Sequence, residues 1–380
     1  MINKEAIFIL KKERKERNVH MKYYLAPLEG ITTYIYRNAY HKIFHPMDKY
    51  FTPFIVPKSK KGMSSRERND ILPEHNKGLY VVPQLLTNQA EDFIQTAKVL
   101  MEYGYQEINL NLGCPSGTVV AKKKGAGFLA QPIELKKFLD EIFSQLTISI
   151  SIKTRLGMEE AQEFESLLKI FNQYPLKEII IHPRVRADYY KNMPNMLAFR
   201  SAFERSCNSV CYNGNIFSDR DFAILCKNFP ELSSVMLGRG VIANPNICTE
   251  CEEMYFLQTE SKSKKGKDQR ENLKIQETYF MQIQEKSREL QSQKEKLANK
   301  KEQFKEFHAQ IYEEYQRVLS GERNVLFKMK EIWSYMVQSF SNYEIYEKKI
   351  KKSESLRNYK AVINALFREQ EVIDNGRFSF

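Results

Sequence analysis

The chain has 380 residues, of which 59 are Lys or Arg and 47 are Asp or Glu, so its formal net charge is +12. This length accommodates one large domain and a smaller one, and the basic surplus is typical of proteins that bind a polyanion, although solubility alone also explains it. The six cysteines are unevenly spaced, which argues against a disulfide framework, and neither a signal peptide nor an apolar stretch of about 18 residues is present. We therefore expect a soluble, cytoplasmic protein, with residues 1–20 as an N-terminal extension.

Residues 21–250 alternate between short apolar segments and helical patterns. Eight segments are expected to form strands: 23–26, 50–54, 79–84, 107–110, 148–152, 178–181, 209–212 and 234–237. Helical periodicity separates most of them, as in 90–103, 133–145, 159–172 and 219–229. Because eight strands alternating with helices describe a closed barrel better than an open sheet, we predict an α/β fold, a (β/α)8 TIM barrel. A doubly wound sheet is the alternative, and it would usually carry Gly-x-Gly-x-x-Gly after its first strand, where this chain has Ala-Pro-Leu-Glu-Gly.

Polar residues follow the predicted strands three to eight, at the end of a barrel where active sites lie. They are Gln84; Asn109, Asn111 and Cys114; Lys153 and Arg155; His182 and Arg184; Asn213, Gly214 and Asn215; and Gly238, Arg239 and Gly240. The glycine turns after strands seven and eight favour a phosphate site, with two ordinary turns as the alternative. We expect this ring to be the functional site.

Cys114 stands where an apolar strand breaks into Gly-Cys-Pro. Pro115 fixes its own backbone and favours an extended Cys114, so the thiol can exchange a proton at one fixed point. The alternative is a small buried hydrophobe, the usual role of a free cysteine. Lys153 could stabilise negative charge on a reduced cofactor ring, or it could simply reach solvent.

Two further clusters are ambiguous. Basic residues interleaved with Tyr189 and Tyr190 suit an extruded base or single-stranded nucleic acid, but a solvated charge cluster is the usual interpretation. The basic residues are Lys122, Lys123, Lys124, Arg184 and Arg186. Cys248 and Cys251 form a lone Cys-x-x-Cys without a second pair or a histidine at zinc spacing, so we predict structural cysteines and no metal site.

The composition changes after Asn246. Residues 258–303 are rich in Lys, Glu and Gln, and we expect a charged linker and a long, mostly exposed helix, with Ile283, Leu290 and Leu297 seven residues apart. Helical periodicity over residues 304–375 predicts a small C-terminal all-α helical bundle. Its apolar faces are Phe304, Phe307, Ile311, Tyr315 and Val318; Leu326, Met329, Trp333, Met336 and Phe340; and Leu356, Tyr359, Ile363 and Leu366.

Five segments, 26–32, 111–115, 153–157, 212–215 and 238–240, resemble in order and spacing the motifs of tRNA-dihydrouridine synthases. The resemblance covers about residues 23–250. It implies an FMN enzyme whose barrel precedes a helical tRNA-binding domain, with NADPH reducing the flavin and no metal. The reduced flavin would then deliver hydride to C6 of a uracil in tRNA, and Cys114 would protonate C5 from the other face. We expect a monomer.

The resemblance also implies roles by motif position. Pro27 and Leu28 would lie beneath the isoalloxazine, and Gln84, Lys153 and His182 would hold the flavin ring. The FMN phosphate would lie against Asn213, Gly214, Gly238 and Arg239, and Asn111 and Arg184 would face the target uracil. The chain departs from the family at Leu28, where methionine is more usual, at Pro183, where glycine is commoner, and at Asn109, where an acid is frequent.

Two rival functions stay open. Another FMN barrel oxidoreductase, similar to dihydroorotate dehydrogenase and acting on a free pyrimidine, would share the phosphate turns and the lysine, but it does not explain the +12 charge or the helical tail. A non-catalytic RNA-binding protein that kept a flavin barrel is the second rival, and the intact Cys114 and Lys153 argue against it.

Overall fold

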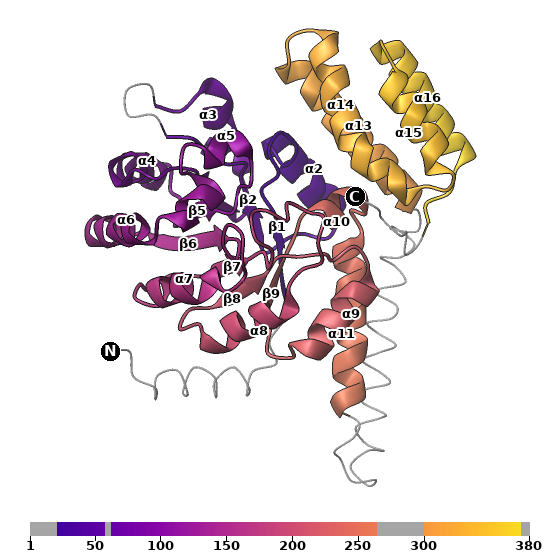
Figure 1. Cartoon of the computed structure of the whole chain (residues 1–380). Helices are drawn as coiled ribbons and strands as arrows, with labels where there is room; N and C mark the ends of the chain where they lie inside the picture. The colour runs from indigo at the N-terminus through magenta and orange to yellow at the C-terminus, as the bar shows by residue number, and fades with distance from the viewer. Residues whose placement is uncertain (1–20, 58–61, 264–299, 374–380) are drawn as a thin grey trace.

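The computed structural model describes residues 21–57, 62–263 and 300–373, and it consists of a parallel barrel followed by a helical bundle (Figure 1). The strands are β1 Lys22–Leu25, β2 Lys49–Phe51, β3 Val81–Val82, β4 Gln84–Leu85, β5 Glu107–Leu112, β6 Ser149–Thr154, β7 Ile179–Ile181, β8 Val210–Tyr212 and β9 Ser234–Leu237. All paired strands are parallel, which confirms the predicted TIM-like α/β class.

The sheet closes through a broken strand. Its order is β3-β2-β1-β9-β8-β7-β6-β5-β4, so β3 and β4 lie at the two ends. They are the halves of the single strand predicted at 79–84, separated by Pro83, whose carbonyl accepts a hydrogen bond from the Asn109 N–H at 2.9 Å. Proline cannot donate to the ladder, which accounts for the break at this position. The eight predicted strands therefore form one ring.

The two faces of the strands have different partners. Outward residues such as Ile108 and Leu110 join the main hydrophobic core with the surrounding helices. Inside the barrel, a smaller cluster consists of Tyr24, Ala26, Phe51, Val82, Ile180, Cys211 and Met236. These residues come from β1–β3 and β7–β9, or directly follow them, whereas β4–β6 turn polar side chains into the same interior. The barrel is therefore apolar on one side and polar on the other.

Helices cover the outside of the barrel. They are α2 Tyr34–Ile43, α3 Ser65–Ile71, α4 Ala90–Glu102, α5 Gly117–Val120, α6 Pro132–Gln145, α7 Glu163–Phe171, α8 Met196–Arg205, α9 Asp219–Asn228, α10 Arg239–Ala243 and α11 Ile247–Ser263. Helix α7 begins four residues later than the predicted 159, because the Glu163 carboxylate accepts hydrogen bonds from the N–H groups of Met158, Glu159 and Glu160 and holds the preceding segment in a turn.

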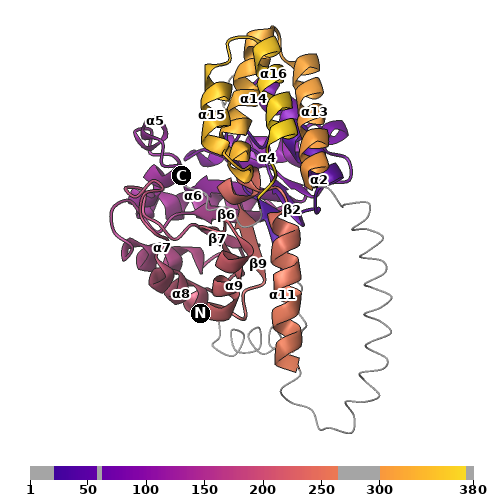
Figure 2. The same cartoon turned by 90° about the vertical axis from the view of Figure 1, so that its right-hand side faces the viewer.

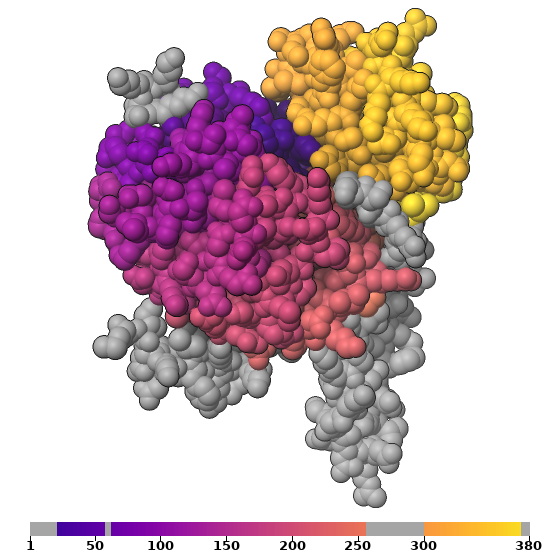
Figure 3. All heavy atoms as spheres, viewed as in Figure 1, coloured from indigo at the N-terminus to yellow at the C-terminus, as the bar shows by residue number. Residues whose placement is uncertain are grey.

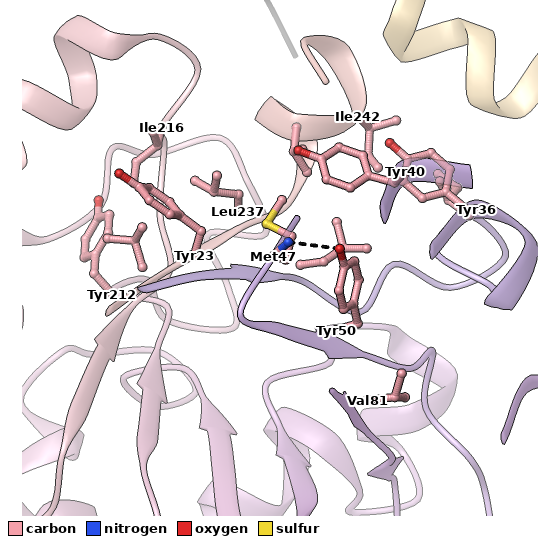
Figure 4. Close-up of a cluster of buried hydrophobic side chains, with 14 of the residues drawn as sticks. Tyr23, Tyr36, Tyr40, Met47, Tyr50, Val81, Tyr212, Ile216, Leu237 and Ile242 are labelled. Atoms are coloured by element: carbon pink, nitrogen blue, oxygen red, sulfur yellow. Dashed lines mark hydrogen bonds between the residues drawn. The ribbon is translucent and has the colours of Figure 1, made fainter. Parts of the chain in front are cut away.

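The aromatic layer between the sheet and its helices is visible in Figure 4. Tyr36 and Tyr40 on α2 lie near Ile242 on α10, and the Tyr50 hydroxyl on β2 accepts a hydrogen bond from the Met47 N–H at 2.9 Å. The Tyr40 hydroxyl donates to the Pro245 carbonyl at 2.9 Å. The hydroxyls of Tyr40 and Tyr50 thus have polar partners in the core, whereas the buried Tyr36 hydroxyl has none within the described part of the chain.

The bundle consists of α13 Lys300–Val318, α14 Glu322–Met336, α15 Tyr343–Lys352 and α16 Leu356–Glu369. The predicted apolar faces are buried with one exception, since Val318 at the end of α13 is 46% exposed. Helix α11 runs along the side of the barrel and crosses residue 250 without interruption (Figure 2). The predicted helix at Ile283, Leu290 and Leu297 and the extension 1–20 lie outside the described residues.

The bundle packs directly on the barrel. Phe304 and Phe307 on α13 contact Phe44 at the end of α2, and the Ser339 hydroxyl donates to the Ala243 carbonyl at 2.6 Å. A recess remains between the two parts, with Phe54 on the barrel side and Leu319 on the bundle side (Figure 3). In the described part of the chain, no helix has the length and apolar character needed to cross a bilayer.

Candidate functional site

The ends of β6, β7, β8 and β9 meet around one pocket at the barrel mouth. Its lining includes nine of the predicted residues: Pro27, Leu28, Lys153, His182, Arg184, Asn213, Gly214, Gly238 and Arg239. Residues as distant in the chain as Pro27 and Arg239 meet here because the carboxyl ends of parallel barrel strands share one rim. The other predicted residues, Gln84, Asn111 and Cys114, lie outside this lining. Asn111 is nevertheless paired in register with Lys153 across β5 and β6.

Two of the three glycines in this pocket, Gly214 and Gly240, leave no room for a side chain. A Cβ on Gly240 would lie 2.0 Å from the Ile216 carbonyl oxygen, and one on Gly214 would lie 2.1 Å from the Tyr212 hydroxyl. The Asn213 amide donates to the Met236 carbonyl at 2.8 Å and ties the turn after β8 to β9. The two segments after β8 and β9 are therefore packed closely against neighbouring parts of the chain at the pocket.

Positive charge is concentrated at this rim. The Arg184 guanidinium, buried at 2% exposure, donates to the Asn192 carbonyl at 2.6 Å and contacts the His182 ring nitrogen at 2.8 Å. Arg239 stacks on the Tyr190 ring at 4.4 Å. Burial and neighbouring cations lower the pKa of Arg184 and hold the pKa of His182 well below its usual value, so the imidazole is neutral.

Lys153 points into this environment from β6. Burial first, and then the nearby Arg155, lower its pKa to about 8. Among the ion pairs within the described ranges, none involves Lys153, Arg155 or Arg184. A buried cation without a carboxylate partner is unfavourable, and an anion bound in the mouth would relieve that cost.

Arg155 belongs to the predicted ring of strand-end residues, but the sequence assigned it no specific role. Its side chain donates to the carbonyls of Gly113 at 3.0 Å, Val185 at 2.9 Å and Tyr189 at 2.8 Å, so it joins the loops after β5 and β7. Tyr190 lines the pocket and was noted only as part of a basic and aromatic cluster. The sequence signal for a role of Arg155 is its position at the end of a buried strand, two residues after Lys153.

Cys114 follows β5 on a tightly packed turn. The Asn111 side-chain oxygen accepts from the N–H groups of Gly113 and Cys114, both at 3.0 Å. Gly125, at φ +55°, packs so closely that a Cβ there would lie 2.9 Å from the Cys114 Cβ. Burial raises the pKa of the half-buried thiol, against the opposing effects of the Ser116 N–H, Arg155 and Lys153. Cys114 is therefore a protonated thiol at neutral pH, suited to giving a proton.

The remaining cysteine pair is packed in the core. Cys248 and Cys251 are fully buried in α11, and the Cys248 sulfur lies 3.5 Å from the Met47 sulfur. Burial raises the pKa of both thiols. Within the ranges that the structure describes, no three His, Cys, Asp or Glu side chains gather as metal ligands would.

The chain is similar to one family model and to curated relatives. A family model described as dihydrouridine synthase (Dus) matches residues 24–332. A probable tRNA-dihydrouridine synthase of Staphylococcus aureus strain COL is 28% identical over 233 residues, covering 58% of this chain and 68% of the relative. The tRNA-dihydrouridine synthase B of Pasteurella multocida is 22% identical over 223 residues, covering 58% of this chain and 66% of the relative. Among solved structures, histamine dehydrogenase from Rhizobium sp. 4-9 has a TM-score of 0.45 at 11% identity, covering 61% of this chain and 45% of that one.

Proposed function

This chain belongs to the dihydrouridine synthase (Dus) family, and from that premise we propose that it binds FMN in the barrel mouth and reduces uridines of tRNA at the expense of NADPH. The family consists of flavoenzymes that modify tRNA. The overall reaction balances when NADPH and one proton are consumed and uridine becomes dihydrouridine with release of NADP⁺. Bound FMN would supply the hydride-transfer chemistry between the nicotinamide and the pyrimidine.

The residues at the mouth fit such a cofactor. Gly214 and Gly240 stand where side chains are excluded, and Arg239 is directed at the same pocket, which supports a phosphate at the turns after β8 and β9. Lys153 would balance negative charge that develops on a reduced ring. The neutral His182 would offer a hydrogen bond without adding another charge.

The single observation that carries the proposed chemistry is the position of Cys114 beside this pocket. Its turn is joined to the pocket side by Arg155, and its thiol keeps its proton at neutral pH. In the proposed reaction the thiol would donate that proton to C5 as hydride arrives at C6, and solvent would restore it. Because the uracil must leave the stacked tRNA to reach a barrel mouth, its ring would be flipped out. The net charge of +12 would supply sequence-independent attraction to the phosphates.

The test begins with the visible spectrum of the purified protein. Flavin bands should bleach when NADPH is added without oxygen and return when undermodified tRNA is added. A Cys114→Ala variant should still be bleached by NADPH, but it should form dihydrouridine about a hundredfold more slowly, since the general acid is lost. Cys207→Ala is the matched control because Cys207 is the other partly exposed cysteine of the described chain. A colourless protein that FMN cannot reconstitute would refute the proposal, and rapid turnover of a free pyrimidine without RNA would favour the rival oxidoreductase.

A further inference from the structure

A chain of buried amides crosses the polar half of the barrel interior. Strand β5 places Asn109 and Asn111 on one face, and the strands on either side contribute Gln84 from β4 and Ser151 from β6. Asn109, Gln84 and Ser151 are 0% exposed and Asn111 is 7% exposed. Such side chains are retained in a core only when their polar atoms are hydrogen-bonded.

The hydrogen bonds between these side chains form a continuous chain that ends at the backbone of Cys114. The Asn109 Nδ2 donates to the Ser151 Oγ at 3.0 Å, and the Asn109 Oδ1 accepts from the Gln84 Nε2 at 2.8 Å. The Gln84 Oε1 accepts from the Asn111 Nδ2 at 2.7 Å. The Asn111 Oδ1 then accepts from the backbone N–H groups of Gly113 and Cys114.

The donor-to-acceptor direction of this chain of hydrogen bonds is set where the chain ends at the backbone of the Cys114 turn. A peptide N–H can only donate, so Asn111 must turn its oxygen to the Cys114 turn and its NH2 group to Gln84. Gln84 must then present its oxygen to Asn111 and its NH2 group to Asn109, and Asn109 must present its NH2 group to Ser151. The orientation of each amide is thereby set by its neighbour, and a change at Ser151 reaches the turn of Cys114 through three side chains.

We propose that Asn109 and Ser151 are positioning residues for Cys114. Neither belongs to the lining of the mouth pocket, and their side-chain hydrogen bonds run to each other and to Gln84. They hold Gln84 in the one orientation that lets Asn111 keep its oxygen on the Cys114 N–H. The expected effect of these residues on catalysis rests on the proposed function. Their effect on how rigidly the Cys114 thiol is held does not.

The test compares Ser151→Ala with Ser149→Ala. Both serines lie on the inward face of β6, but Ser149 is paired with Glu107 and takes no part in the amide chain. The first readout is the rate at which iodoacetamide alkylates Cys114 in the full-length protein without tRNA, followed on the Cys114 peptide by mass spectrometry. Because a loosened turn exposes the half-buried thiol, Ser151→Ala should react about fivefold faster than wild type, and Ser149→Ala should match wild type within about twofold.

Two substitutions at Asn109 test the direction of the chain. Asn109→Leu removes the acceptor for Gln84 and should accelerate alkylation about tenfold or more. Asn109→Asp keeps an acceptor for the Gln84 NH2 group and lets the Ser151 hydroxyl donate in its turn, so it should stay within about twofold of wild type. In the reaction with tRNA, kcat should be lower in Ser151→Ala than in wild type and lower again in Asn109→Leu. KM should change little in either variant. If Asn109→Leu does not fold, Ser151→Ala decides the question.

Wild-type alkylation rates in both Ser151→Ala and Asn109→Leu would overturn the proposal, and so would an Asn109→Asp variant as reactive as Asn109→Leu. The two proposals can fail separately. A wild-type protein that forms no dihydrouridine while the alkylation rates keep the expected order would refute the proposed function and leave the positioning role intact.

Discussion

Lys153 occupies a place where its charge is costly. Lys153 and Arg155 both extend from the end of β6. The Arg155 side chain donates hydrogen bonds to three backbone carbonyls, and these contacts include no carboxylate. Burial and this neighbour lower the pKa of Lys153 to about 8, so the amine changes charge just above neutral pH. Any anion in the mouth stabilises the charged form and raises this pKa again, which couples ligand binding to proton uptake.

We therefore expect FMN affinity to fall as pH rises through the pKa of Lys153. The dissociation constant, measured by quenching of flavin fluorescence, should increase about tenfold between pH 7 and pH 9.5. Lys153→Met should bind about tenfold to a hundredfold more weakly at pH 7 and show no such rise. Lys153→Arg is the control, because its charge persists throughout this range. Equal pH dependence in wild type and Lys153→Met would contradict the role of this amine.

At the scale of single elements, β5 shows what can be inferred from a sequence and what cannot. Its apolar alternation predicted a strand at 107–110, and the structure extends the strand to Leu112. The strand-end residues of the pocket could be grouped in advance, because parallel strands of a barrel all end on one rim. The contact between Gln84 and Asn109 could not, because it depends on the register between β4 and β5, which no local pattern encodes.

A second polar cluster lies at the N-terminal ends of the strands, and it affects how the stability of the protein depends on pH. Glu178 and Glu107 share Lys49, whose amine lies 3.8 Å from the first carboxylate and 2.8 Å from the second. Burial raises the pKa of Glu178 above its usual value. A raised folded-state pKa means that the protonated form is favoured by folding, so the stability it contributes is present at low pH and is lost as pH rises through that pKa.

Glu178→Gln should accordingly stabilise the protein by about 1 kcal/mol at pH 8 and have a smaller effect at pH 5. The Tyr24 and Ser234 hydroxyls, which donate to Glu178, can donate equally to an amide oxygen. Glu107→Gln is the comparison and should destabilise, because it removes the nearer partner of Lys49. Urea unfolding at both pH values measures the difference, and a Glu178→Gln variant less stable than wild type at pH 8 would contradict the sign of the effect.

At the scale of the whole molecule, the bundle supports the loops of the barrel mouth. One hydrophobic core includes residues of both parts, so the bundle is not merely tethered. On α14, the Lys328 amine donates to the Gly30 carbonyl at 2.6 Å, within the segment 26–32 that also carries Pro27 and Leu28 of the pocket. Ser339 binds the Ala243 carbonyl at the end of α10, the short helix that begins at Arg239. The segments after β1 and after β9, which both flank the pocket, are therefore hydrogen-bonded to side chains of the bundle.

This arrangement predicts that a change in the bundle weakens FMN binding without touching the pocket. Lys328→Met removes the bond to Gly30 and should raise the FMN dissociation constant about threefold to tenfold, because the segment that we propose supports the flavin loses a charge-assisted hydrogen bond. Lys330→Met is the matched control: Lys330 lies on the same helix and donates to the Ser353 carbonyl at 2.9 Å, but that bond stays within the bundle. Fluorescence titration of both variants at pH 7, with melting curves to show that each is folded, separates a local effect from general destabilisation. Equal affinities in the two variants would mean that the mouth segment keeps its conformation without the Lys328 bond, and would contradict the supporting role of α14.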